Sequence, residues 1–89
     1  MTRKHVDYDS VSKAILRKLF YDKRIGGRHL GLEDLKRGFP SHLKGDVDKK
    51  LKKLVKDNLI IPHPTSYGPQ YALNPKLLQD VINILSDSK

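Results

Sequence analysis

The sequence predicts an α+β domain that is mainly helical and carries one small β-hairpin. Apolar residues recur at helical spacing in four segments. A short apolar run at 59–61 and a second at 70–73 flank a turn signature, which is typical of a hairpin. The chain has 89 residues and suits a single domain over 1–89. The predicted order is helix, short strand, two helices, two strands and a final helix.

The first helix is predicted to begin after Asp9 and Ser10, whose side-chain oxygens can cap it. Its apolar residues form one stripe, and Gly26-Gly27 is predicted to end it. Residues 1–7 are interpreted as a flexible basic arm. Residues 28–30 lie between glycines and are predicted to form a strand of two or three residues.

A short second helix is expected from Leu32 to Arg37, because its early acids and late bases complement the helix dipole. Gly38 follows it and breaks the pattern. The third helix begins somewhere in 41–46, and the sequence leaves both Ser41 and Gly45 open as its cap. A start at Ser41 places Gly45 inside the helix, at a cost of about 1 kcal/mol relative to Ala.

The third helix is the most strongly patterned segment. Its apolar arc is formed by Val47, Leu51, Leu54 and Val55. Four lysines lie on the opposite arc, at roughly 140–240° from the first apolar residue when each residue turns 100°. These are Lys49, Lys52, Lys53 and Lys56. Asn58 is interpreted as a left-handed cap at the end of this helix.

The predicted hairpin follows at once. Its first strand is the apolar run 59–61, and Pro62 and Pro64 either end that strand or confine it to an edge. The turn covers 66–69, and the second strand is 70–73. Asn74-Pro75 is a typical helix start, so a final helix is predicted over 75–86.

Charge is the first indication of function. Eighteen Lys and Arg oppose ten Asp and Glu, giving a net charge of +8, which favours polyanionic partners. The absence of cysteine excludes disulfides and thiol chemistry. No apolar run approaches the ~20 residues of a membrane span, and no signal-peptide core follows the basic N-terminus. We therefore expect a cytoplasmic protein, associated with the nucleoid if the source is prokaryotic.

The run Leu54-Val55-Lys56-Asp57-Asn58-Leu59-Ile60, with residues 35–39 and 47–54 before it, carries a family resemblance. It resembles the passage from recognition helix to wing in winged helix-turn-helix DNA-binding domains of the small bacterial and archaeal transcriptional regulators. This family usually has Gly where the chain has Asn58, and charged residues where its wing has prolines. The resemblance covers nearly the whole chain. It implies a regulator whose third helix enters the major groove of double-stranded DNA.

The resemblance also implies which residues touch DNA, and the most basic helix face in the chain agrees with it. On the third helix and its approach, these are His42, Lys44, Lys49, Lys52, Lys53 and Lys56. Ser66 and Tyr67 of the wing and Arg28 before the first strand are further candidates for backbone contact. Lysine suits phosphates better than base edges, so we expect phosphate contacts and modest base readout. The alternative is an ordinary solvated helix face.

The sequence predicts neither an enzyme nor a cofactor or metal site. The four histidines lack ligand spacing, and no Gly-rich phosphate loop is present. The main alternative function is a winged-helix protein–protein interaction module of a transcription or replication assembly, because fold alone does not determine function. A small-molecule sensor is a third option, although no ligand site is evident.

The final helix is a candidate homodimer seam. Its apolar residues exceed what one short helix needs for a small core, unless the first helix covers all of them. These residues are Leu77, Leu78, Val81, Ile82, Ile84 and Leu85.

Overall fold

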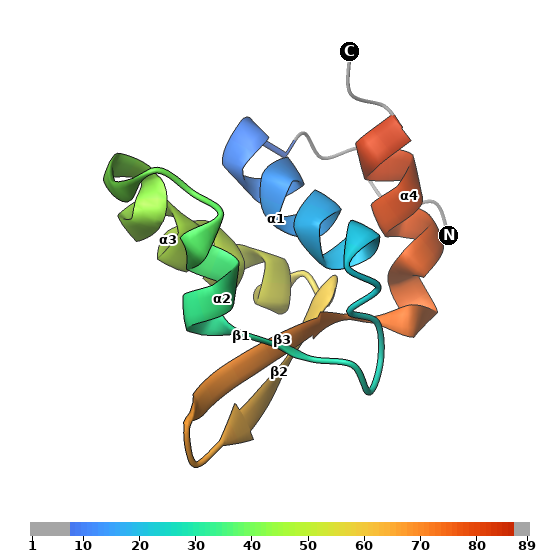
Figure 1. Ribbon diagram of the computed structural model, residues 1–89. Helices are drawn as coiled ribbons and strands as arrows, with labels where there is room; N and C mark the ends of the chain where they lie inside the picture. The colour runs from blue at the N-terminus through green and yellow to red at the C-terminus, as the bar shows by residue number, and fades with distance from the viewer. Residues whose placement is uncertain (1–7, 87–89) are drawn as a thin grey trace.

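The computed structural model describes residues 8–86, which fold as helices packed on a small antiparallel sheet (Figure 1). The predicted α+β class and element order are confirmed. Residues 1–7, interpreted above as an arm, lie outside the described residues. The helices are α1 (Ser10–Tyr21), α2 (Leu32–Arg37), α3 (Lys44–Lys56) and α4 (Leu78–Ser86). The strands are β1 (Leu30–Gly31), β2 (Ile60–Thr65) and β3 (Gly68–Leu73), and two 3₁₀ turns cover Ser41–Leu43 and Pro75–Leu77.

Helix α1 begins as predicted but ends earlier. Asp9 Oδ1 accepts a hydrogen bond from the Ser12 backbone N–H at 2.8 Å, which confirms the predicted cap. The helix stops at Tyr21, because Lys23 takes a left-handed φ of 58°. The Arg24 N–H then closes on the Leu19 carbonyl at 2.8 Å, as in a Schellman ending. The prediction that the helix extends to Gly26-Gly27 is therefore wrong.

The start of α3 resolves the two alternatives that the sequence left open. A 3₁₀ turn from Ser41 leads directly into the α-helix, and Leu43 occupies its cap position without a side-chain hydrogen bond. Neither Ser41 nor Gly45 is the cap of α3, and Gly45 lies inside the helix. At the other end, Asn58 has a φ of 66°, which confirms the predicted left-handed cap.

The three strands pair antiparallel in the order β1-β3-β2. Strand β2 continues through Pro62 and Pro64 at the edge of the sheet, which confirms the edge alternative and shows that the strand does not end at residue 61. Strand β2 is an edge strand, and alternate residues of a strand direct their backbone nitrogens to the same side. The nitrogens of Pro62 and Pro64, which have no hydrogen to donate, therefore fit the unpaired edge of the sheet. The turn contains only Ser66 and Tyr67, since Thr65 already pairs with Gly68. Strand β1 begins at Leu30, two residues after the first residue of the predicted range 28–30.

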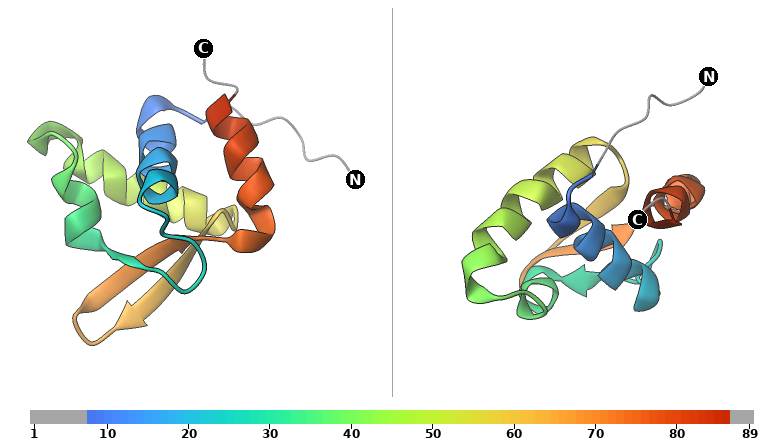
Figure 2. Two further views of the ribbon diagram at one scale, coloured as in Figure 1. Left: turned by 45° about the vertical axis from the view of Figure 1, so that its right-hand side comes forward. Right: turned by 90° about the horizontal axis from the view of Figure 1, so that it is seen from above.

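The core lies where α1, α3 and the sheet meet, and α1 runs between α3 and α4 in every view (Figure 2). Ile15 and Leu19 of α1 are fully buried, as are Val47 and Leu54 of α3. Val81 is the fully buried residue of α4. None of the helices described between residues 8 and 86 has the length and apolar character needed to cross a membrane.

Candidate nucleic-acid interface

Three lysines form an exposed row on α3. Burial of Val47 and Leu54 orients the helix and directs Lys49, Lys52 and Lys56 to solvent. At 100° per residue the three lysines fall within an arc of roughly 60°. They span about 10 Å along the helix axis at 1.5 Å per residue. We call these three residues the lysine row; none of them forms an ion pair with a described residue.

The other lysines on the middle of α3 are neutralised by neighbouring carboxylates. Lys50 Nζ lies 2.8 Å from Asp9 Oδ2 at the start of α1. Lys53 Nζ lies 3.1 Å from Asp57 Oδ2 and 6.0 Å from the centre of the Tyr8 ring. The Tyr8 hydroxyl donates a hydrogen bond to the same Asp57 oxygen at 2.7 Å. Lys53, predicted as a DNA contact, is thus held on the side of α3 that faces the start of α1.

The Asp9–Lys50 contact also shifts both ionisation equilibria. Burial alone would raise the pKa of Asp9, but hydrogen bonds from Lys50 and from the Ser12 backbone outweigh it and hold that pKa below its usual value. The hydrogen bond to Asp9 raises the pKa of Lys50. Asp9 therefore caps α1 and also neutralises a lysine of α3.

A second ion pair fixes α3 against α2. Lys36 Nζ of α2 lies 2.8 Å from Asp48 Oδ2 of α3, and this hydrogen bond raises the pKa of Lys36. Tyr71 of β3 lies close by; burial raises the pKa of its hydroxyl, and the negative charge of Asp48 adds to the effect. The Asp48 carboxylate on this side of α3 is therefore paired with Lys36 of α2.

The two residues predicted at the start of the interface differ in exposure. His42 is exposed in the 3₁₀ turn that leads into α3. Lys44 is half-buried and, at roughly 60° from Val47, lies beside the buried arc of the helix. The structure therefore places Lys44 outside the lysine row.

The tip of the β2–β3 hairpin projects on the same side of the molecule as α3 (Figures 1 and 2). The two predicted residues at the tip, Ser66 and Tyr67, are exposed, and Tyr67 is 97% exposed. The Thr65 hydroxyl is used within the turn: it donates to the Gly68 carbonyl at 2.6 Å and accepts from the Tyr67 N–H at 3.2 Å. This leaves Ser66 and Tyr67 as the tip side chains that can reach a partner.

Carboxylates border this tip. An open cavity of about 220 Å³ separates the hairpin tip from the start of α2, and Glu33 and Asp34 line it together with Tyr67. Arg37 Nη1 lies 2.8 Å from Asp34 Oδ1, whereas Glu33 is exposed. The start of α2 is therefore an unfavourable place for phosphate, which makes α3 the principal basic element on this side.

The structure separates Arg28 from the hairpin tip. The loop 22–29 joins the far end of β3, where the Gly26 N–H donates to the Leu73 carbonyl at 3.0 Å. Gly68 and Leu73 are the two ends of β3, about 17 Å apart at 3.3–3.4 Å per strand residue. Arg28 is exposed in that loop, so the prediction that groups it with α3 and the wing is not supported by its position.

Sequence reasoning missed two features of this region. The Lys53–Asp57 pair has the i,i+4 spacing and could have been recognised. The stacking of His29 on His63, with ring centres 4.0 Å apart and planes 5° from parallel, joins distant segments and had no sequence signal.

The described residues contain no group of three or more His, Cys, Asp or Glu side chains that could hold a metal ion. Comparisons with protein-family models, with curated proteins and with solved structures found no match.

Proposed function

We propose that the protein is a winged-helix domain that binds duplex DNA and acts as a transcriptional regulator. Helix α3 is the recognition helix, and the β2–β3 hairpin is the wing. The lysine row contacts phosphates at the edges of the major groove. His42 at the approach to α3 and Ser66 and Tyr67 at the hairpin tip add further contacts to the DNA.

The lysine row carries this proposal. Local acids neutralise Lys50 and Lys53 of the same helix, while Lys49, Lys52 and Lys56 keep their charge available on one arc. Their spread of about 10 Å is comparable with the major groove, which is about 12 Å wide. An arc of positive charges with this spread is suited to contact with the phosphate backbone of DNA.

The chemistry of the lysine row favours contacts with phosphates over recognition of bases. Lysine is a flexible point charge, whereas bidentate base contacts usually use Arg, Asn or Gln, and α3 has none of these. We therefore expect strong salt dependence and modest sequence preference. Selection from a random duplex library at moderate salt measures that preference.

Fluorescence anisotropy with a random-sequence duplex at several salt concentrations tests the proposal. Reversing two charges of the row, Lys49→Glu with Lys52→Glu, should weaken binding strongly and reduce the slope of log K against log salt by about 2. Unchanged affinity and slope would rule out α3 as the DNA-binding element.

The hairpin favours a second candidate function, a protein–protein interaction module. Residues 60–73 contain no Lys, Arg, Asp or Glu, and the segment exposes Tyr67 almost completely and Ile61 by 41%. Exposed aromatic and aliphatic side chains are typical protein contacts. A gel shift with random duplex at low salt separates the two functions: the absence of any shift favours the interaction module.

A further inference from the structure

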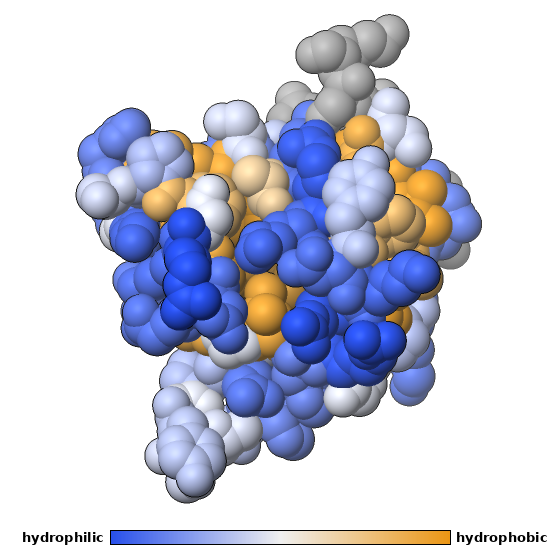
Figure 3. Space-filling model, viewed as in Figure 1, coloured by the Kyte–Doolittle hydropathy of each residue, from blue (hydrophilic) through white to orange (hydrophobic). Residues whose placement is uncertain are grey.

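A second basic surface lies on α1 and on the loop that follows it. All four arginines within the described residues lie on α1, on this loop or on α2, and α3 contains none. Figure 3 shows the most hydrophilic side chains of this face over the same elements. We define the arginine surface by five cations of α1 and the loop: Arg17, Lys18, Lys23, Arg24 and Arg28.

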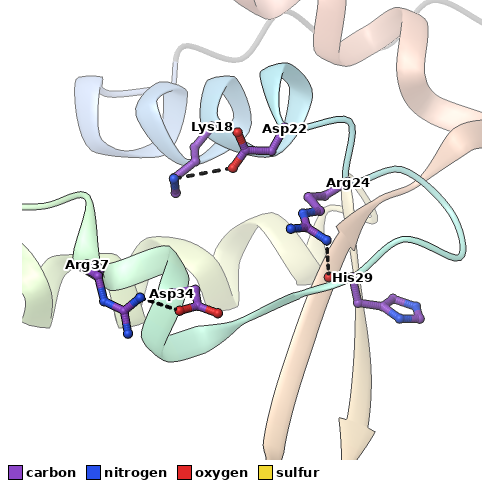
Figure 4. A network of polar contacts seen from close by, with 6 residues as sticks. All are labelled: Lys18, Asp22, Arg24, His29, Asp34 and Arg37. Carbon is purple, nitrogen blue, oxygen red and sulfur yellow. Dashed lines mark hydrogen bonds and ion pairs between the residues drawn. The ribbon is translucent and has the colours of Figure 1, made fainter.

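Little local charge opposes these cations. Asp22 is the single acid between residues 10 and 32, and it pairs with Lys18 at 3.4 Å (Figure 4). Arg17, Lys23 and Arg28 are exposed and form no ion pair with a described residue. Arg24 also lacks an ion pair within residues 8–86, so the surface presents four unneutralised cations within a stretch of twelve sequence positions, from 17 to 28.

Arg24 is the anchor of this surface. Its Nη1 donates to the His29 carbonyl at 3.1 Å, which holds the guanidinium in place (Figure 4). Its Nε is buried without a hydrogen-bond partner, and no described carboxylate lies within ion-pair distance. A guanidinium stays charged. Because no described carboxylate neutralises it, the fixed charge of Arg24 adds to the positive potential of this surface and favours an anion bound there.

The arginine surface and the lysine row point in different directions. Helices α1 and α3 pack against each other through their buried arcs, so their solvent arcs face away from the shared core (Figure 2). The loop 22–29 lies at the end of the sheet opposite the hairpin tip. A straight duplex seated on α3 and the hairpin therefore leaves Arg17 and Arg28 unoccupied.

We propose that the arginine surface binds the phosphate backbone of a second DNA duplex, so that one molecule joins two DNA segments. This inference rests on the proposed function, because the first segment occupies the lysine row. Arginine–phosphate contacts provide charge-assisted, often bidentate hydrogen bonds without base recognition. The joining is therefore independent of the sequence of the second segment and sensitive to salt.

A bridging assay tests the inference. Duplex DNA is fixed on beads, the full chain is added, and retention of a second, labelled duplex is measured together with anisotropy on a single duplex. The test variant is Arg17→Ala with Arg28→Ala, because both side chains are exposed. The control is Lys50→Ala with Lys53→Ala, which removes the same charge from ion-paired positions.

We expect the wild type and the control to retain the labelled duplex. The arginine variant should retain at least about tenfold less labelled duplex than the wild type. Its affinity for a single duplex should change by no more than about twofold to threefold. The same retention in the arginine variant would overturn the inference, because bridging would then arise from association of two copies. An equal loss in the control would also overturn it, because net charge would explain the effect.

Failure of the inference is distinguishable from failure of the proposed function. A wild type whose single-duplex binding depends on Lys49 and Lys52 but which retains no second duplex overturns bridging and leaves the proposed function intact. Single-duplex binding that does not respond to Lys49 and Lys52 overturns both. Unlabelled polyglutamate that displaces the second duplex more effectively than unlabelled DNA would assign the surface to an acidic polypeptide and overturn the inference.

Discussion

Individual ion pairs decide which lysines of α3 can reach a partner. Lys49 and Lys50 are neighbours in the sequence, yet the first is exposed without a described acid and the second is held by Asp9. The sequence correctly predicted that lysines occupy the solvent arc of α3. It could not show that Lys50 is paired, because Asp9 approaches α3 only through the packing of α1, whereas the spacing of Lys53 and Asp57 could have revealed their pair.

Asp9 provides a test at the scale of one residue. Asp9→Ala should lower the free energy of unfolding by about 1 kcal/mol, because the cap of α1 is lost. Asp9→Asn should keep most of the cap but lose the ionic contact with Lys50. Because folding lowers the pKa of Asp9, its ionic stabilisation is present above the usual value of 3.8 and is lost as pH falls through the lower, folded value.

Urea unfolding at about pH 7 and about pH 3 checks this expectation. The stability difference between the wild type and Asp9→Asn should shrink at the lower pH. A difference of the same size at both pH values would show that the Asp9 charge does not contribute to stability.

At the scale of elements, the sequence predicted the features that depend on neighbouring residues but not those that depend on tertiary packing. The caps at Asp9, Asn58 and Asn74 were predictable, because a cap depends on the residue and its immediate neighbours. The sequence left open whether Pro62 and Pro64 end β2 or confine it to an edge, because the choice depends on the position of the strand in the sheet. The early end of α1 at Tyr21 had no signal in the sequence, because it depends on a positive φ at Lys23, which lysine seldom adopts.

Gly45 tests the observed start of α3. The residue is inside the helix, and nothing lies within 4 Å of an added Cβ. Gly45→Ala should therefore raise the free energy of unfolding by up to about 1 kcal/mol. Gly68→Ala is the matched control: its surroundings are equally open, but its φ of +114° makes the substitution destabilising. Thermal unfolding measures both, and a destabilised Gly45→Ala variant would contradict a helix that includes this position.

At the scale of the molecule, α4 uses most of its apolar surface within the chain. Val81 is fully buried, and Leu78, Ile84 and Leu85 pack partly buried against the core, as does Leu77 in the 3₁₀ turn before α4. Ile82 is half-buried without belonging to that core, and Gln79 and Asn83 form a hydrogen bond on the exposed side. The part of α4 that remains available for the predicted dimer seam is the edge around Ile82.

We keep the homodimer as a prediction, now centred on Ile82. Sedimentation equilibrium at tens of micromolar should give a dimer for the wild type and a monomer for Ile82→Asp, because a carboxylate in an apolar seam is costly to desolvate. Asn83→Asp, which is exposed and lies roughly 100° from Ile82 on the same helix, serves as the control and should stay dimeric. A monomeric wild type would contradict the seam.

The central claim is that the unpaired lysines of α3 bind duplex DNA. The most direct test compares two double variants of equal charge in the same helix: Lys49→Ala with Lys52→Ala, and Lys50→Ala with Lys53→Ala. Anisotropy titrations with one duplex at several salt concentrations give the affinity and the salt slope of each. The first variant should bind weakly, with a slope reduced by about 2, and the second should behave nearly as the wild type. Equal effects of the two variants, or no effect of the first, would contradict the claim.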